Sequence, residues 1–192
     1  GDGMWDGWEV LHNLKPLDGT DSWDDPDGDR VPNVWEYQNG ETDPKASTSK
    51  PMFTHVVDPA TGASDSSDTV YVTINEATDA ATAWDSTNEY PLIQVKAGVY
   101  SENLYLSGGN KVLLLADLGP DPVIIKTNST DETVELRTEA LLDGFEITHA
   151  PNVTGQGVYI YLSDATSRAR LINCIVRGNE ASYNTAGIYV DR

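Results

Sequence analysis

The sequence predicts a mainly β fold, in which a solenoid of short strands follows a small acidic module with short helices. Three observations support this prediction. From Val70 onward, short runs of Val, Ile, Leu and Tyr alternate with Gly, Asn, Asp and Pro, as in β-strands separated by turns. The strand pattern repeats, because Gly157–Ile160 recurs 30 residues later as Gly187–Val190. Residues 1–44 differ in composition and carry closely spaced aspartates.

The most regular acidic segment is the stretch 25–36, DPDGDRVPNVWE. It places oxygen-bearing groups at positions 1, 3, 5, 7, 9 and 12 of a cation-binding loop. Four carboxylates in one tight turn repel one another, by roughly 3 kcal/mol per pair at about 5 Å and an effective dielectric near 20. Calcium would relieve this repulsion and takes oxygen ligands at flexible geometry, so Ca²⁺ is the predicted ion. The expected ligands are Asp25, Asp27, Asp29, Val31 through its backbone carbonyl, Asn33 and Glu36.

An incomplete copy of this unit stands at the start of the chain. Shifting the sequence by 27 residues matches Gly1–Glu9 to Gly28–Glu36. In this register Asp2, Asp6 and Glu9 occupy positions 5, 9 and 12 of an earlier loop, and they are predicted metal ligands as well.

Each loop is expected to lead into a short helix. Asp6 with Glu9, and Asn33 with Glu36, have the spacing of a helix-start capping box. The first helix is expected to run to about residue 13 and the second to end at residues 39–40. A small apolar contact between the helices is assigned to Trp8, Leu11, Trp35 and Tyr37.

The loop departs from the EF-hand pattern at two positions. Arg30 stands where a glycine normally makes the bend with positive φ. Pro32 has no amide hydrogen to donate to the short β-bridge by which EF-hand loops pair. The sequence therefore argues against a calmodulin-like pair.

The string GDGMWDGWEVLHNLKPLDGTDSWDDPDGDRVPNVWEYQNGETDP resembles the EF-hand-like, thrombospondin type 3-like calcium-binding repeats of bacterial secreted and surface proteins. The resemblance covers residues 1–44 and rests on the aspartate spacing, the aromatic residue with Glu, and the closing Thr42–Pro44. It implies calcium binding and a secreted or cell-surface location, where millimolar calcium fills weak loops. An acidic solvated linker that binds nothing is the alternative interpretation.

Composition narrows the expected partners. A net charge of −19 with only 12 Lys and Arg argues against binding to nucleic acid or to an anionic membrane. No apolar stretch approaches 18 residues, so no membrane span is expected. A lone cysteine, Cys174, excludes an internal disulfide framework. Cations are the expected partners.

Residues 45–69, rich in Ser, Thr, Asp, Pro and Gly, predict a connector, and the strand domain is expected over residues 70–192. A helix near residues 73–83 is expected to cap the amino-terminal end of the strands. Strands that repeat every 20 to 30 residues predict a solenoid in which successive coils cover one another. Because side chains alternate along a strand, Phe145 and Ile147 are expected inside and Glu146 outside.

The segments IQVKAGVYSENL, LLDGFEIT and INCIVRGNEA with GIYV look like the amino-terminal half of right-handed parallel β-helix proteins of the pectin lyase-like superfamily. This resemblance covers about residues 53–192. It implies a right-handed parallel β-helix that is incomplete or stacked end to end. Family members include pectate lyases, pectin methylesterases and adhesins, so the resemblance implies a fold and leaves the activity open.

No catalytic constellation is found, since Asp143, His149, Asp164 and Arg177 are scattered and are interpreted as turn or solvent-face residues. Three functions stay open. The favoured one is a secreted or cell-surface structural protein, stabilised by calcium, whose copies associate head to tail into an extracellular filament. The alternatives are a fragment of a polysaccharide-active β-helix enzyme and a calcium-dependent adhesin.

Overall fold

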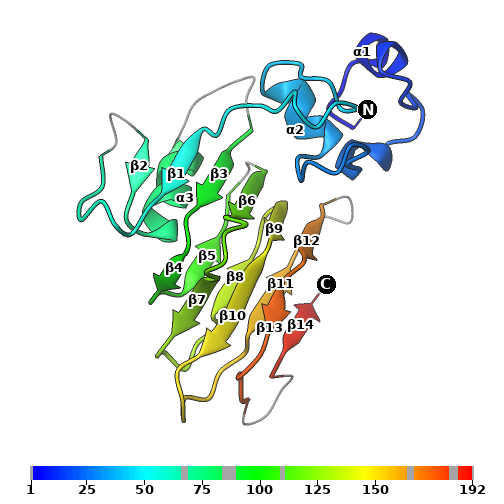
Figure 1. The fold of residues 1–192 in the computed structure, drawn as a ribbon. Coiled ribbons are helices and arrows are strands. Elements are labelled where there is room, and N and C mark those ends of the chain that lie inside the picture. Colours follow the sequence, from blue (N-terminus) through cyan, green and yellow to red (C-terminus); the bar gives the residue numbers. More distant parts are fainter. Residues whose placement is uncertain are drawn as a thin grey trace. The chain divides into compact units, whose positions relative to one another are not determined.

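The computed structural model describes residues 2–65, 69–83, 90–108, 111–163, 167–181 and 186–191. The chain divides into two compact units, Gly1–Met52 with Ser86–Tyr90, and Phe53–Asp85 with Pro91–Arg192. Figure 1 shows that the helices α1 and α2 belong to the first unit and the strands to the second.

The first unit contains the helices α1 (Asp6–Leu11), η1 (Asp21–Trp23) and α2 (Asn33–Gln38). Trp8, Trp23 and Trp35 are buried, and the ring centroids of Trp23 and Trp35 lie 5.2 Å apart in an edge contact. The expectation that Leu11 joins this contact is wrong, because its side chain is 74% exposed. The expected contact between α1 and α2 exists between Trp8 and Tyr37, whose ring centroids lie 5.3 Å apart, and Trp23 of η1 packs against Trp35.

The expected capping boxes are also absent from the two helices. The residues at the helix starts are Trp5 and Pro32, and neither helix has a side-chain capping bond. The physical reason is that the side chains of Trp5 and Pro32 offer no acceptor for a helix amide, and Pro32 has no backbone N–H to which Glu36 could bond.

The second unit contains three parallel sheets and one helix, α3 (Ile74–Ala83). The first sheet has the strand order β12-β9-β6-β3-β1-β2, the second β13-β10-β7-β4 and the third β14-β11-β8-β5. From β3 onward the chain visits the first, second and third sheets in strict rotation, four times over the described strands. The strands are β1 (His55–Val57), β2 (Val70–Tyr71), β3 (Leu92–Val95), β4 (Gly98–Tyr100), β5 (Leu104–Leu106), β6 (Val112–Ala116), β7 (Val123–Thr127), β8 (Val134–Leu136), β9 (Ala140–Asp143), β10 (Phe145–His149), β11 (Val158–Tyr161), β12 (Ala169–Ile172), β13 (Ile175–Val176) and β14 (Ile188–Asp191).

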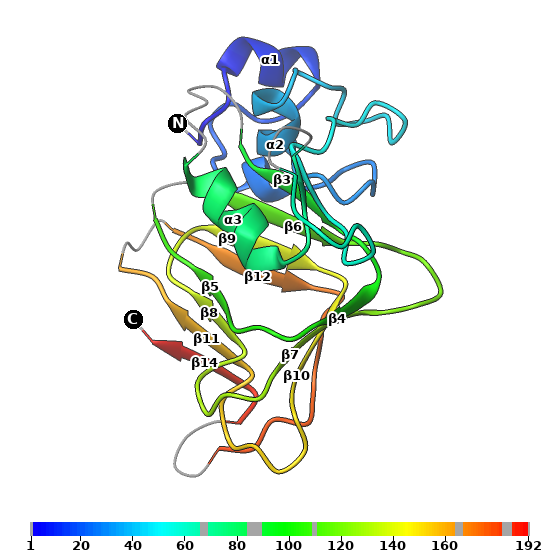
Figure 2. The ribbon, with the colours of Figure 1, turned by 90° about the vertical axis from the view of Figure 1, so that its left-hand side faces the viewer.

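The register confirms the repeat that the sequence predicts. Val158 pairs with Ile188 on one side and with Val134 on the other, so the matching Gly-Val-Tyr-Ile and Gly-Ile-Tyr-Val segments lie in neighbouring strands. Phe145 and Ile147 are buried and Glu146 between them is partly exposed, as expected from alternation along a strand. Figure 2 shows the three sheets around this common apolar interior.

Helix α3 covers one end of the interior, because Ile74, Ala77 and Ala81 are fully buried in the same apolar cluster as the strands. The helix contacts β1, β2, β3 and β5. At its start, the carboxylate of Glu102 accepts hydrogen bonds from the backbone amides of Ile74 and Asn75, both at 2.9 Å. The helix expected near residues 73–83 therefore exists and has the capping position that the sequence predicts.

The segment expected as a connector, residues 45–69, contains a strand. β1 pairs through His55 with Ile93 of β3 and through Val56 with Val70 of β2. Only three residues form this strand, and turn-forming residues surround it, so local composition does not reveal it. Its position comes from a partner that lies 38 residues later in the chain.

Among the described residues, no helix has the length and apolar character that a membrane crossing requires.

Candidate metal centre

The loop of residues 25–36 is organised by hydrogen bonds from backbone amides to its own carboxylates. Asp25 accepts the amides of Gly28, Asp29 and Arg30 at 2.9, 3.2 and 2.8 Å. Asp29 Oδ1 accepts the amide of Val31 at 2.8 Å. These bonds fold the loop so that its carboxylates converge.

Arg30 keeps the bend that a glycine normally makes. Its φ is +79° and that of Gly28 is +75°. A residue with a β-carbon in this region costs on the order of 1 kcal/mol. The loop therefore keeps the usual bend with an arginine at the glycine position, and the positive φ of Arg30 lowers the stability of the folded loop.

Three carboxylates of the loop form a tight group. Oxygen atoms of Asp25, Asp27 and Asp29 all lie within 4.8 Å of one another. Two oxygens that bind one calcium ion can be up to about 5 Å apart, because each lies at roughly 2.5 Å from it. The group therefore fits a single cation of this size.

Further oxygens around the loop are buried and unsatisfied. Within the described part of the chain, the atoms Asp27 Oδ2, Asp29 Oδ2, Asn33 Oδ1 and Glu36 Oε2 have no hydrogen-bond partner. Lys50 Nζ lies 3.7 Å from Asp29 Oδ2, which offsets part of its charge. Leaving a buried acceptor unpaired costs about 1–3 kcal/mol, more when it is charged. A bound cation would satisfy these oxygens together.

The electrostatics of the loop agree with this geometry. Burial, together with the nearby charges of Asp29, Asp27 and Asp25, raises the pKa of Glu36 to about 8, against a lowering by the Thr42 hydroxyl. Burial also raises the pKa values of Asp27 and Asp29. A cation that binds here must therefore displace a proton from Glu36 at neutral pH.

The earlier loop contributes a second group, in which carboxylate oxygens of Asp2, Glu9 and Asp21 lie within 4.8 Å of one another. Asp2 and Glu9 are predicted ligands that the structure brings together. Asp6, the third predicted ligand of this loop, is exposed and is not part of the group.

Asp21 is a candidate ligand that sequence reasoning missed. It lies outside the nine-residue repeat, in η1, and no loop template assigns it a position. The aspartate-rich sequence around Asp21 indicates a possible cation-binding region. Asp21 itself becomes a candidate ligand only because the chain folds back toward Glu9.

Among the described residues of the strand unit, the scattered polar side chains form no comparable group. His149 Nε2 lies 2.9 Å from the carbonyl oxygen of Asp131, and its Nδ1 lies 3.0 Å from Thr133 Oγ1 and 2.8 Å from Asn179 Oδ1. Asp143 is buried and accepts a hydrogen bond from Asn173. Asp164 lies outside the described residues. Because His149 and Asp143 are only 3% and 2% exposed, the expectation that they are turn or solvent-face residues is wrong. These contacts give both residues structural partners in the strand unit.

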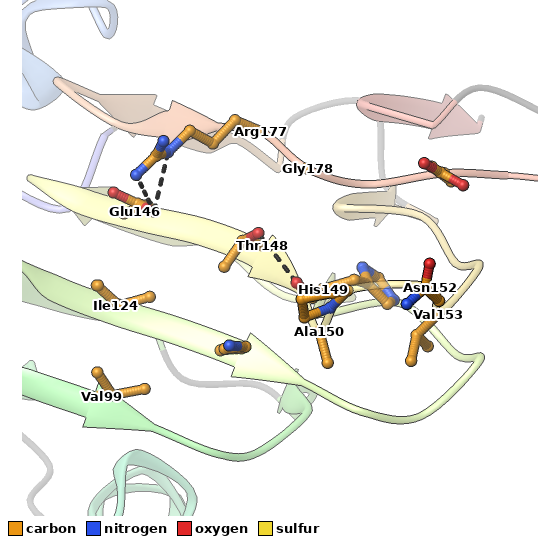
Figure 3. A pocket seen from close by; sticks show the side chains of 13 residues that line it. Val99, Ile124, Glu146, Thr148, His149, Ala150, Asn152, Val153, Arg177 and Gly178 are labelled. Carbon is orange, nitrogen blue, oxygen red and sulfur yellow. Dashed lines mark hydrogen bonds and ion pairs between the residues drawn. The ribbon is translucent and has the colours of Figure 1, made fainter.

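An open pocket of about 600 Å³ lies beside the second sheet (Figure 3). Arg177 forms an ion pair with Glu146 at its edge, with Nη2 at 2.8 Å from the carboxylate. Val99 and Ile124 give its floor an apolar character. No metal-binding group of three carboxylates, histidines or cysteines lies here among the described residues.

Comparisons with protein-family models, with curated proteins and with solved structures found no match for this chain.

Proposed function

We propose that this chain is a secreted or cell-surface structural protein in which Ca²⁺ stabilises an acidic module and a second unit forms a right-handed parallel β-helix. One observation carries the calcium part of the proposal. In the described portion of the chain, all buried side-chain polar atoms that lack a hydrogen-bond partner lie in the first unit. They are Trp8 Nε1, Glu9 Oε1, Asp21 Oδ1, Asp27 Oδ2, Asp29 Oδ2, Asn33 Oδ1 and Glu36 Oε2.

The chemistry of these atoms favours calcium over other cations. Six of the seven atoms are oxygens, and neither three-residue group contains a histidine or cysteine. Zinc and copper favour nitrogen and sulfur ligands, and Mg²⁺ keeps several waters and a strict octahedron. Flexible carboxylate and carbonyl oxygens around a hard ion are the arrangement that calcium prefers.

The β-helix part rests on the rotation of the chain through three parallel sheets. Each circuit pairs with the circuits before and after it, as Leu104, Val134, Val158 and Ile188 do in the third sheet. Parallel strands joined by crossovers are right-handed in nearly all proteins, which supports the proposed hand. Helix α3 caps the first circuit, as a terminal cap does in other solenoids.

An extracellular location follows from the proposed ion. In the loop of residues 25–36, Arg30 holds a positive φ, and this backbone strain lowers the expected affinity for an ion. Loops of modest affinity fill at the millimolar calcium outside cells.

The experiment that tests the calcium proposal combines chelation with limited proteolysis of the full chain. Removal of calcium is expected to expose cleavage sites within residues 1–44 and to leave the strand unit protected, because the loops have little apolar core. Asp27→Ala and Glu36→Ala are expected to mimic the chelator. Asp79→Asn, a charge removal on the exposed face of α3, serves as the control. Unchanged cleavage on chelation would refute the structural role of the ion.

Self-association is proposed at the strand edge formed by β12, β13 and β14. Large apolar side chains there are 38–56% exposed, and they are Ile172, Ile175, Ile188 and Val190. Unpaired strand edges are templates for another chain, and α3 covers the opposite end of the interior. We propose a head-to-tail contact between this edge and a neighbouring copy. Light scattering of the purified chain that finds only monomers up to about 100 µM would overturn self-association and leave the calcium proposal standing.

A second candidate function, contact with a polysaccharide, is supported by tyrosines on the outer face of the third sheet. Tyr159 pairs with Tyr189, and their rings stack with centroids 5.7 Å apart and an angle of 10°. Tyr105 on β5 is 49% exposed, and Arg137 lies 5.9 Å from the Tyr159 ring centroid. Exposed aromatic rings with a neighbouring cation suit the apolar faces and acidic groups of uronic polysaccharides. Binding without product formation would favour an adhesin, and unsaturated or de-esterified products would favour an enzyme.

A further inference from the structure

We infer that Asp21 completes a second calcium site with Asp2 and Glu9, and that Asn33 couples this site to the loop of residues 25–36, so that two ions bind cooperatively. The inference rests on the proposed calcium function and specifies its stoichiometry and regulation. Asp21 belongs to the second site and Asn33 to the 25–36 loop, and a hydrogen bond joins the two residues.

The second site combines converging carboxylates with buried oxygens that accept no hydrogen bond in the described chain. Carboxylate oxygens of its three residues lie within 4.8 Å of one another. Glu9 is 1% exposed and Asp21 6% exposed. In the residues that the structure describes, Glu9 Oε1 and Asp21 Oδ1 accept no hydrogen bond. Two buried carboxylate oxygens without donors, close to a third carboxylate, require a cation or protons.

The other oxygen of Asp21 is held in place by the backbone. Lys15 donates its amide to Asp21 Oδ2 at 2.9 Å, and Leu14 donates its amide to the carbonyl oxygen of Glu9 at 2.8 Å. These two bonds bring the segment after α1 back to the loop. Asp21 therefore has one oxygen used for positioning and one available for an ion.

Asn33 connects the two sites through its side-chain amide. Its nitrogen Nδ2 donates to the backbone carbonyl oxygen of Asp21 at 2.8 Å, and Asn33 is fully buried. Its oxygen Oδ1 has no partner in the described chain and belongs to position 9 of the 25–36 loop. Since the amide is planar, an ion that binds Oδ1 fixes the direction of Nδ2 and therefore the position of Asp21.

The backbone joins the same two elements a second time. The amide of Asn33 donates to the carbonyl oxygen of Asp24 at 2.9 Å, directly before the 25–36 loop. Trp23 and Trp35 pack against each other between η1 and α2. Ordering of one loop by an ion thus lowers the cost of ordering the other, which is positive coupling by definition.

The experiment is calcium titration of the full chain by calorimetry, repeated with three variants. The unaltered chain is expected to bind two ions with positive cooperativity. Asp21→Asn keeps the shape of the side chain and its acceptor for the Lys15 amide. It is expected to weaken the ion of the Asp2, Glu9 and Asp21 site by at least tenfold and, through the coupling, the ion of the 25–36 loop by a smaller factor. Asn33→Asp keeps an oxygen ligand and loses the Nδ2 donor. It is expected to retain both ions and to lose the cooperativity.

Glu36→Gln gives an independent measure of the coupling. It weakens the ion of the 25–36 loop and is expected to weaken the ion of the Asp2, Glu9 and Asp21 site as well, by between about 5-fold and 150-fold. Hydrogen exchange at the Lys15 amide reports occupancy of that site without reference to the other. In the unaltered chain calcium is expected to slow this exchange.

The possible results distinguish calcium binding itself, the second site and the coupling between the two sites. A chain that binds no calcium overturns the proposed function and this inference with it. One bound ion that Glu36→Gln removes and Asp21→Asn leaves unchanged overturns the second site alone. The coupling is overturned if two ions bind and the affinity of the Asp2, Glu9 and Asp21 site is the same in the unaltered chain, in Asn33→Asp and in Glu36→Gln.

Discussion

The hydroxyl of Thr42 donates a hydrogen bond to Glu36 Oε1 at 3.0 Å, and the second oxygen of the same carboxylate has no partner in the described chain. Thr42 belongs to the segment that follows α2. It therefore orients the carboxylate of Glu36, the last predicted ligand of the 25–36 loop, from outside the loop. This bond lowers the pKa of Glu36 against the larger raising effect of burial.

Thr42→Val is expected to weaken calcium binding at the 25–36 loop. The hydroxyl stabilises the charged form of Glu36, and a hydrogen bond to a charged group contributes about 1.5–3 kcal/mol, or roughly 10-fold to 100-fold in affinity. Calorimetric titration measures the change. Thr42→Ser restores the hydroxyl and is expected to bind nearly as the unaltered chain does. Equal affinities for the Val and Ser variants would contradict the orienting role of this bond.

Glu36→Gln is expected to have opposite effects on stability with and without calcium. The amide resembles the protonated carboxyl group, so in the presence of chelator it removes the cost of protonating Glu36 on folding and raises the thermal midpoint of the first unit. With calcium present the same variant loses a ligand and has a lower midpoint than the unaltered chain. Tryptophan fluorescence follows the transition, because Trp8, Trp23 and Trp35 are buried in this unit. A lower midpoint under both conditions would show that Glu36 acts only through packing.

Stability without calcium is expected to fall as pH rises. Glu36 has an ordinary pKa near 4.5, and burial raises its pKa to about 8 in the folded chain. Because the folded state holds the proton more tightly, its contribution to stability is complete below pH 4.5 and is lost as pH rises through 8. Burial raises the pKa of Glu9 as well, which acts in the same direction.

Urea unfolding in chelator at pH 5 and pH 8.5 measures this dependence through the fluorescence of the first unit. The free energy of unfolding is expected to be lower at the higher pH by a few kcal/mol, at about 1.4 kcal/mol per unit of pKa shift. Saturating calcium is expected to reverse the trend, because the ion binds the deprotonated carboxylates. Glu36→Gln is the control, in which the dependence becomes weaker. A free energy that rises with pH in chelator would contradict the buried, raised-pKa state of Glu36.

Most strands of the second unit could be predicted from the sequence, because alternating burial and short apolar runs follow directly from strand geometry. Phe145 and Ile147 are examples, since both lie inside as their spacing predicts. β1 was not readable, because three residues between turn-forming segments carry too little periodicity. Its identity as a strand depends on pairing with β3, which is a tertiary interaction.

The candidate site could be predicted from the sequence where its candidate ligands lie close together along the chain. Asp25, Asp27 and Asp29 converge because alternate residues of one loop do so in any calcium loop of this spacing. Asp21 was not readable, since it reaches its partners only through the return of the chain after α1. The capping boxes failed because the N-cap positions are Trp5 and Pro32, one residue before the expected Asp6 and Asn33, and neither side chain accepts a hydrogen bond. Local rules give way where tertiary burial offers a side chain a different environment.

Glu102→Ala is expected to loosen α3 from the end of the strand array. The carboxylate accepts two backbone amides at the helix start, those of Ile74 and Asn75, and thereby satisfies donors that have no partner within the helix. Loss of a helix cap costs about 0.5–2 kcal/mol, and the change falls on the helix that covers Ile93 and Leu104 of the interior. Hydrogen exchange is expected to accelerate over residues 74–83 first, with residues 1–44 unaffected. Glu102→Gln keeps one acceptor oxygen and is expected to lose about half of this stabilisation. If exchange in α3 is the same in the Ala variant as in the unaltered chain, the helix is held by its apolar face alone, and the carboxylate only fills space at the end of the strands.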